Sequence, residues 1–127
     1  MSLLLLLATS VTASAQEPYA ALSATTLTFY YDDLRSTHAK TFDLNTGTNI
    51  PAWHEYAEDI LVVEFDPAFV YAEPTSLYMW FADMSNLKYF QTIGALRTHN
   101  VTNMHATFKG CSSLYSALQL TNWIRVK

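Results

Sequence analysis

The sequence contains a single cysteine, Cys111, and only three glycines among its 127 residues. An exported domain held together by disulfide bonds would carry several cysteines, so this fold must be stabilised by packing. Loops that bind phosphate through backbone amides are rich in glycine, and none is expected here. Cys111 lies in Gly110-Cys111-Ser112-Ser113-Leu114. It is interpreted as a small buried residue of the core rather than as a nucleophile.

Long apolar runs are also missing. Residues 3–8 form an apolar run that is too short for a membrane-spanning helix, which needs ~20 residues. Ala13-Ser14-Ala15 follows with the small-x-small pattern of a cleavage site, although no Lys or Arg precedes the run. Residues 1–15 are therefore predicted to be a secretory signal peptide. A secreted or cell-surface location is expected, with no transmembrane segment and no lipid anchor, because no cysteine follows the leader.

Acidic residues are absent from the last third of the chain. All eleven Asp and Glu residues lie between Glu17 and Asp83, whereas residues 84–127 contain five Lys or Arg residues. Such asymmetry can mark a surface for an anionic partner. Five well-spaced basic residues do not form the continuous stripe that nucleic acid requires, so no nucleic-acid partner is expected. The preferred interpretation is an acidic cap beside a mildly basic repeat.

What the sequence does contain is a near-repeat. Residues 80–87 align with residues 107–114 at an offset of 27, and Ile93 aligns with Leu120 at the same offset. A fixed period of roughly 20–50 residues is typical of solenoids, in which each unit stacks on its neighbours. The apolar run at residues 60–65 lies about two periods before Leu118, which favours a third coil.

Each coil is expected to contain one short helix and one strand. In the last coil, a helix face is predicted from apolar residues at three- and four-residue steps, namely Val101, Met104, Phe108 and Cys111. Asn100 or Thr102 is predicted to cap this helix at its start, and Gly110 to end it. Residues 118–120 alternate as in a strand.

The chain before the repeat is predicted to form a cap. Residues 27–31 are β-branched and aromatic, as in strands, and residues 40–44 alternate polar and apolar as a partner strand would. Trp53 is predicted to lie beneath this hairpin. The expected organisation is therefore a signal peptide (1–15), an N-terminal β-hairpin cap region (16–59) and repeat coils (60–127), the last of them truncated.

These motifs resemble the BspA-like leucine-rich-repeat surface proteins. Their repeats read Asn-Val-Thr-x-Met-x-x-Met-Phe-x-Gly-Cys-Ser-Ser-Leu, then spaced leucines, then Ser-Asn-Trp, and residues 100–114 and 118–123 match this pattern. Residues 27–32 and 63–69 match the lead-in of the family. The resemblance covers residues 19–123 and implies an α/β fold: a short leucine-rich-repeat-type solenoid, with one strand plus a short helix per coil, preceded by a β-hairpin N-terminal cap.

The sequence departs from the family pattern at three places, one of which is the step from Leu114 to Leu118, one residue longer than usual. Thr107 stands where the family usually has Met, and residues 124–127 follow Trp123 where the family opens its next repeat. Solenoids need terminal caps and roughly three or more units. A truncated fragment without independent function is therefore one of the hypotheses.

The resemblance implies a non-enzymatic protein that mediates protein binding or adhesion. Its expected partner is an extracellular protein or a host-cell surface macromolecule, and no cofactor is expected. Lys88, Gln91 and Gln119 are the candidate contact residues, because they are polar and lie on the predicted strands or at their edges. The alternative is a secreted glycan-binding module, for which Tyr30, Tyr31 and Trp53 are the candidate aromatic residues.

Other motifs favour structural explanations. His54-Glu55-Tyr56-Ala57-Glu58 has the first half of a zinc-protease helix motif but lacks the second histidine, so it is interpreted as a solvated face. His99 and His105 lie six residues apart and do not share a helix face. Asn100-Val101-Thr102 is a glycosylation sequon. It is interpreted first as part of the repeat. No catalytic constellation is recognised.

Overall fold

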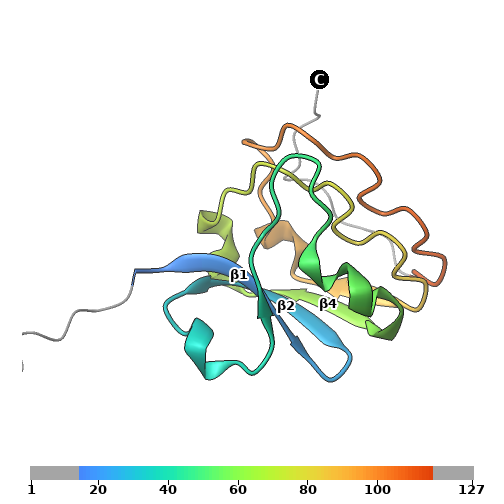
Figure 1. Ribbon diagram of the computed structural model, residues 1–127, viewed down its shortest axis with the longest axis horizontal. Helices are drawn as coiled ribbons and strands as arrows, with labels where there is room; N and C mark the ends of the chain where they lie inside the picture. The colour runs from blue at the N-terminus through green and yellow to red at the C-terminus, as the bar shows by residue number, and fades with distance from the viewer. Residues whose placement is uncertain (1–14, 116–127) are drawn as a thin grey trace, which may run out of the picture.

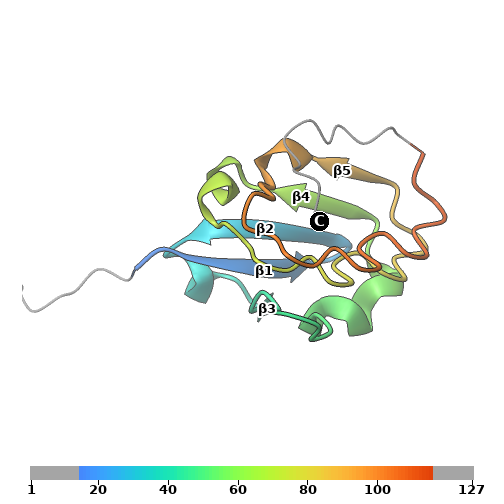
Figure 2. The ribbon, with the colours of Figure 1, turned by 90° about the horizontal axis from the view of Figure 1, so that it is seen from above.

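A computed structural model describes residues 15–115 of the chain. Within this range, five strands form one mixed sheet in the order β3-β1-β2-β4-β5, of which Figure 1 labels β1, β2 and β4 and Figure 2 labels all of them. β1 pairs antiparallel with β2 and with β3, whereas the pairs β2–β4 and β4–β5 are parallel. The strands are β1 (Glu17–Ser23), β2 (Thr26–Asp32), β3 (Thr41–Phe42), β4 (Val62–Phe65) and β5 (Tyr89–Gln91).

The helices of the described part are short and of the 3-10 type. They are η1 (Arg35–Thr37), η2 (Ala52–Asp59), η3 (Pro67–Tyr71) and η4 (Ile93–Ala95). η3 begins after Asp66, whose carboxylate accepts a hydrogen bond from the Ala68 N–H at 3.0 Å. The long turn-rich segments between these elements lie over one face of the sheet (Figure 2). This face and the segments over it enclose the core.

The predicted leucine-rich-repeat solenoid, with one strand and one helix per coil, is wrong. The described residues form a small open mixed sheet, and residues 100–111 form successive turns instead of the predicted helix. Ala106 and Gly110 have positive φ angles of 57° and 81°. Residues in this left-handed conformation interrupt a right-handed helix, so the three- and four-residue steps arise from consecutive turns. The predicted strand at residues 118–120 lies outside the described residues.

The predicted hairpin pairing is also wrong. β2 and β3 occupy the predicted strand positions, but β1 lies between them in the sheet. Seven residues of β1 pair with β2, whereas β3 contributes only two. The longer β1–β2 ladder therefore determines the hairpin. The sheet continues across the predicted boundary at residue 59, because β2 also pairs with β4.

The 27-residue near-repeat has a counterpart in space. Residues 27 apart are direct partners in the β4–β5 pair, as Val62 and Tyr89 show, and Ser76 forms a parallel bridge with Asn103. The segments at 77–83 and 103–109, which we call the first and second repeat segments, lie side by side. Four backbone hydrogen bonds of 2.7–3.0 Å join them, from the N–H groups of Leu77, Met79, Phe81 and Asp83 to the carbonyls of Asn103, His105, Thr107 and Lys109. The two copies also share backbone conformation, since positive φ angles recur at Met79 and Ala106 and at Asp83 and Gly110.

Aromatic side chains fill the centre of the core. Phe29 of β2 stacks on Phe65 and on Trp80, with ring centroids 4.9 and 4.8 Å apart, and Trp53 meets Phe29 edge-on at 5.3 Å. All four side chains are at most 1 % exposed. Trp53 Nε1 donates a hydrogen bond of 2.7 Å to the Trp80 carbonyl, and Trp80 Nε1 donates one to Asn45 Oδ1. The core thus satisfies its own polar ring atoms, as buried indoles require.

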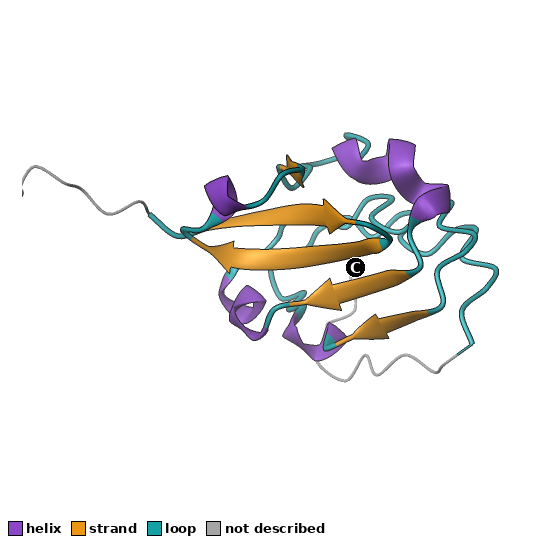
Figure 3. Cartoon of the chain, turned by 90° about the horizontal axis from the view of Figure 1, so that it is seen from below, coloured by secondary structure: helices purple, strands orange, loops and turns teal. Residues whose placement is uncertain are grey.

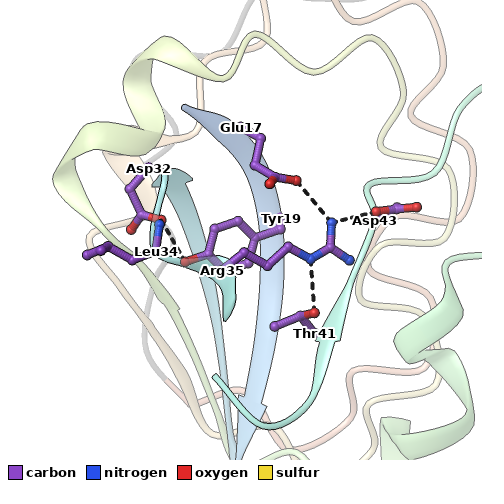
Figure 4. A network of polar contacts seen from close by, with 7 residues as sticks. All are labelled: Glu17, Tyr19, Asp32, Leu34, Arg35, Thr41 and Asp43. Atoms are coloured by element: carbon purple, nitrogen blue, oxygen red, sulfur yellow. Dashed lines mark hydrogen bonds and ion pairs between the residues drawn. The ribbon is translucent and has the colours of Figure 1, made fainter. Parts of the chain in front are cut away.

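Arg35 ties η1 to the outer strands (Figure 4). Its Nη1 lies 2.6 Å from Asp43 and 3.2 Å from Glu17, and its Nε donates to the Thr41 hydroxyl at 2.9 Å. The hydrogen bond to Asp43 raises the pKa of the guanidinium. Burial, and then the hydrogen bond from its hydroxyl to Asp32, raise the pKa of Tyr19. This network anchors β1 and β3 to the segment that covers them.

Candidate binding face of the sheet

The sheet has one face that points away from the core. Figure 3 looks onto it, with the strands in front and the loops behind. We call it the open face. Because side chains alternate along a strand, it takes every second residue of β2, β4 and β5. The resulting set is Thr26, Thr28, Tyr30, Val62, Glu64, Tyr89 and Gln91. Gln91 is exposed and the other six are half-buried.

A polar row crosses the middle of the open face. Thr28, Glu64 and Gln91 are register partners on three neighbouring strands. The Thr28 hydroxyl donates a hydrogen bond of 3.2 Å to Glu64 Oε2. Beside this row is a hollow of about 290 Å³, whose lining includes Tyr30, Glu64 and Asp66. The face therefore offers hydroxyl, amide and carboxylate groups, next to an aromatic ring, on rigid backbone.

Tyr30 is held in place by its neighbours. Its ring stacks on Tyr19 with centroids 5.3 Å apart and lies 4.7 Å from the ring of His38. Tyr19 itself is 0 % exposed, because Arg35 and His38 lie against it. The open face is thus bounded on the β1 side by a fixed aromatic wall.

Two of the three predicted contact residues lie at one edge of this face. Gln91 is exposed on β5, and Lys88 is exposed immediately before it. The Lys88 backbone is held in place, since its N–H donates to the Leu61 carbonyl at 2.8 Å and its carbonyl accepts from the Tyr115 N–H at 3.3 Å. Gln119 lies outside the described residues. Thr28 and Glu64 were not among the predicted contact residues, although the alternation of side chains along a strand identifies the positions that face outward.

The three aromatic residues proposed for glycan binding lie in different places in the structure and do not form one surface. Tyr30 lies on the open face, whereas Tyr31 follows it in β2 and packs against the core cluster. Trp53 is fully buried, as its predicted place beneath the cap implies. A buried indole cannot stack on a sugar, so Trp53 is not a contact residue.

The histidines have separate partners. His54 Nε2 lies 2.9 Å from Asp83 Oδ2 in a groove of about 490 Å³, and His99 Nε2 lies 3.2 Å from Glu73. His105 stacks on Tyr78 with centroids 5.7 Å apart. Among residues 15–115, no three His, Cys, Asp or Glu side chains are placed to hold a metal ion. The groove at His54 is therefore bridged by the hydrogen-bonded pair of His54 and Asp83, and it has no metal ligand set within the described part.

The sequon lies on an exposed turn. Asn100 is exposed, Val101 is buried, and the Thr102 hydroxyl donates a hydrogen bond of 3.3 Å to the Thr75 carbonyl. The Thr102 N–H donates to the same carbonyl at 2.9 Å. The motif thus helps to join the two repeat segments.

Cys111 lies half-buried against the core cluster. Its thiol donates a hydrogen bond of 3.1 Å to the Phe81 carbonyl. Burial, with a smaller effect of the Asp83 charge, raises the pKa of the thiol to about 11. Because the thiolate is the nucleophilic form, this environment makes the thiol unreactive near neutral pH.

We expect iodoacetamide to alkylate Cys111 about a hundredfold more slowly in the native chain than in the urea-unfolded chain at about pH 8. The reason is that the pKa of the Cys111 thiol is about 11 in the folded chain, against an ordinary value of 9.0. The raised pKa stabilises the folded state below about pH 9, and this contribution is lost as the pH rises through about 11. Mass spectrometry of timed samples measures the rates, and the Cys111→Ser variant gives the background. Equal rates in the folded and unfolded chains would contradict the assignment.

The described residues contain no helix that is long and apolar enough to cross a membrane. In comparisons with known proteins, no family model, no curated protein and no solved structure matches the chain.

Proposed function

We propose that the protein is an exported protein-binding or adhesion module and that the open face is its contact surface. The observation that carries the proposal is the polar row of Thr28, Glu64 and Gln91, which lies outward on three paired strands. The leader pattern of residues 1–15 supports export, and the sequence resemblance to BspA-like surface proteins supports an extracellular partner.

The chemistry of the open face suits a protein partner. Hydrogen-bonding groups and tyrosines at fixed positions are common at protein interfaces, because a tyrosine offers a large area and a polar end at low entropic cost. Tyr89 contributes such a ring, and it meets Tyr115 edge-on at 6.3 Å. The exposed Lys88 adds a positive charge at the rim, where charge affects the rate of association more than affinity.

The test is binding of the full chain to a panel of immobilised extracellular matrix proteins and to host cells. We expect saturable binding to at least one partner, and Gln91→Arg should weaken it by about tenfold or more through a bulky charge on the contact face. Thr48→Arg is the matched control, because Thr48 is exposed and lies away from the open face. Its neighbour Gly47 accepts a hydrogen bond from Ser76, which lies in the segment over the opposite face of the sheet. No saturable binding, or equal loss in both variants, would refute the proposal.

Glycan binding is the second candidate, and one observation favours it. The hollow beside Tyr30 places an aromatic ring next to Thr28, Glu64 and Asp66. A sugar ring needs such an apolar surface together with hydrogen-bonding groups. Binding of the chain to a glycan array would favour this candidate if Tyr30→Ala abolished the binding and Tyr71→Ala did not. Tyr71 is the control because its side chain is 70 % exposed and does not line the hollow.

A further inference from the structure

A second surface, separate from the open face, is formed by the backbone of residues 103–110. In the first repeat segment, the N–H groups of Leu77, Met79 and Asp83 donate to the second segment. The residues one period later are Met104, Ala106 and Gly110. Because the φ angles at 79 and 83 recur at 106 and 110, the second segment presents a similar row of N–H groups on its outer side. Among residues 15–115, these three N–H groups have no hydrogen-bond acceptor.

An apolar groove runs along this row. It has a volume of about 400 Å³ and is lined by Met104, Ala106, Thr107, Phe108 and Lys109. The equivalent positions of the first segment include Leu77, Trp80 and Phe81, which are all 0 % exposed. Phe81 is packed against Phe108 of the second segment, with centroids 5.5 Å apart. The first segment thus shows what this backbone pattern binds: a turn-forming chain that offers carbonyls at alternate residues and a large apolar side chain.

We propose that the outer side of residues 103–110 is a docking site for a turn-forming segment of a partner polypeptide, bound through backbone carbonyls at alternate residues as residues 103–109 are bound to the first repeat segment. A second copy of this chain does not fit the site. Two such rows cannot pair with each other, because both offer N–H donors. The carbonyl side of the first segment is closed as well, since Asn45 Nδ2 binds the Tyr78 carbonyl at 3.1 Å and Trp53 Nε1 binds that of Trp80.

The charge near the site agrees with an acidic group on the partner. Lys109 lines the groove and its side chain is exposed. No Asp or Glu occurs from residue 84 onward. A carboxylate that flanks the apolar residue of the partner would lie near Lys109. The Asp83 carboxylate, which lies beside Gly110 at the far end of the row, is hydrogen-bonded to His54 at 2.9 Å.

The probe is a synthetic peptide with the sequence of residues 100–114, which in this fold already offers carbonyls in the required conformation. Amide exchange of the free full chain is measured by NMR first. We expect fast exchange at Met104, Ala106 and Gly110, and slow exchange at Met79 and Phe81. Slow exchange at the first three amides would overturn the proposal, since the row would already be occupied by the chain itself, including its residues 116–127.

Titration with the peptide should then shift these three amides saturably and slow their exchange. Ala106→Lys should weaken binding by about tenfold or more, because its side chain fills the groove. Gln91→Lys is the matched control on the open face and should leave peptide binding unchanged, so this test is independent of the proposed function. Equal shifts with a scrambled peptide would overturn the proposal. So would faster exchange at Met79 and Phe81, which would mean that the peptide replaces the internal copy.

Discussion

Replacing Trp53 by alanine is expected to lower the free energy of unfolding by about 3–5 kcal/mol, the range for removing a large buried aromatic side chain. The ring is 0 % exposed and contacts Phe29 and Trp80 edge-on at 5.3 and 5.6 Å. Its Nε1–H also satisfies the Trp80 carbonyl. Because a domain is stable by only about 5–15 kcal/mol, this single change removes much of the margin. Urea unfolding followed by far-UV circular dichroism measures the loss.

Trp53→Phe separates packing from the hydrogen bond. It keeps most of the ring but leaves the Trp80 carbonyl without its donor, for an expected cost of about 1–3 kcal/mol. Tyr71→Ala is the control, since Tyr71 is 70 % exposed and should change stability by less than about 0.5 kcal/mol. A loss for Trp53→Ala no larger than this control would contradict the core described above. A broad, non-cooperative transition of the wild-type chain would favour the hypothesis of a fragment without independent function.

The strands β2 and β4 could be predicted because their signals are local. Residues 27–31 and 60–65 combine β-branched and aromatic side chains, and each run ends at polar or proline residues. β1 could not be recognised in this way. Its centre contains Ala20 and Ala21, which have low strand propensity. Both are buried in the folded chain, where β2 and β3 flank them and Ala20 joins the core cluster. The pairing of β2 with β1 therefore depends on contacts between segments, and the pattern of neither segment alone indicates it.

The repeat was recognised correctly as a spacing but wrongly as a helix. Apolar residues at three- and four-residue steps suit an α-helix, but they equally suit consecutive turns that each return to the core. The distinction depends on the φ angles of Ala106 and of its counterpart Met79. Alanine and methionine rarely adopt this conformation, so their side chains gave no sign of it. Gly110 was the one visible indication, and it was interpreted as the end of a helix.

The candidate site was predictable only in part for a similar reason. Gln91 and Lys88 could be chosen as polar residues near a predicted strand. Thr28 and Glu64 become part of the same surface only through the register of β2, β4 and β5. Trp53 shows the converse, because an aromatic residue in a loop is attractive as a contact residue until its burial is known. Sheet order, which the sequence pattern does not contain, therefore determines which polar residues form one face.

Gly110→Ala is expected to lower the free energy of unfolding by about 2–3 kcal/mol, from two separate costs. The φ angle of 81° is unfavourable for any residue with a Cβ atom. An added Cβ would also lie 3.2 Å from Asp83 Oδ1 and 3.3 Å from Asp83 Cα. The second contact involves backbone and cannot be relieved by rotation of a side chain. Residues 107–111 would have to move away from the first repeat segment.

Gly47→Ala isolates the first cost. Gly47 has a φ angle of 56°, and an added Cβ would meet nothing within 4 Å, so only the conformational penalty of about 1 kcal/mol remains. The difference between the two variants therefore measures how tightly the repeat segments pack. Gly110→Ala should also accelerate alkylation of Cys111, because the thiol is bonded to Phe81 across the same contact. Equal stability losses at the two glycines, with no change in thiol reactivity, would mean that the segments are not in close contact.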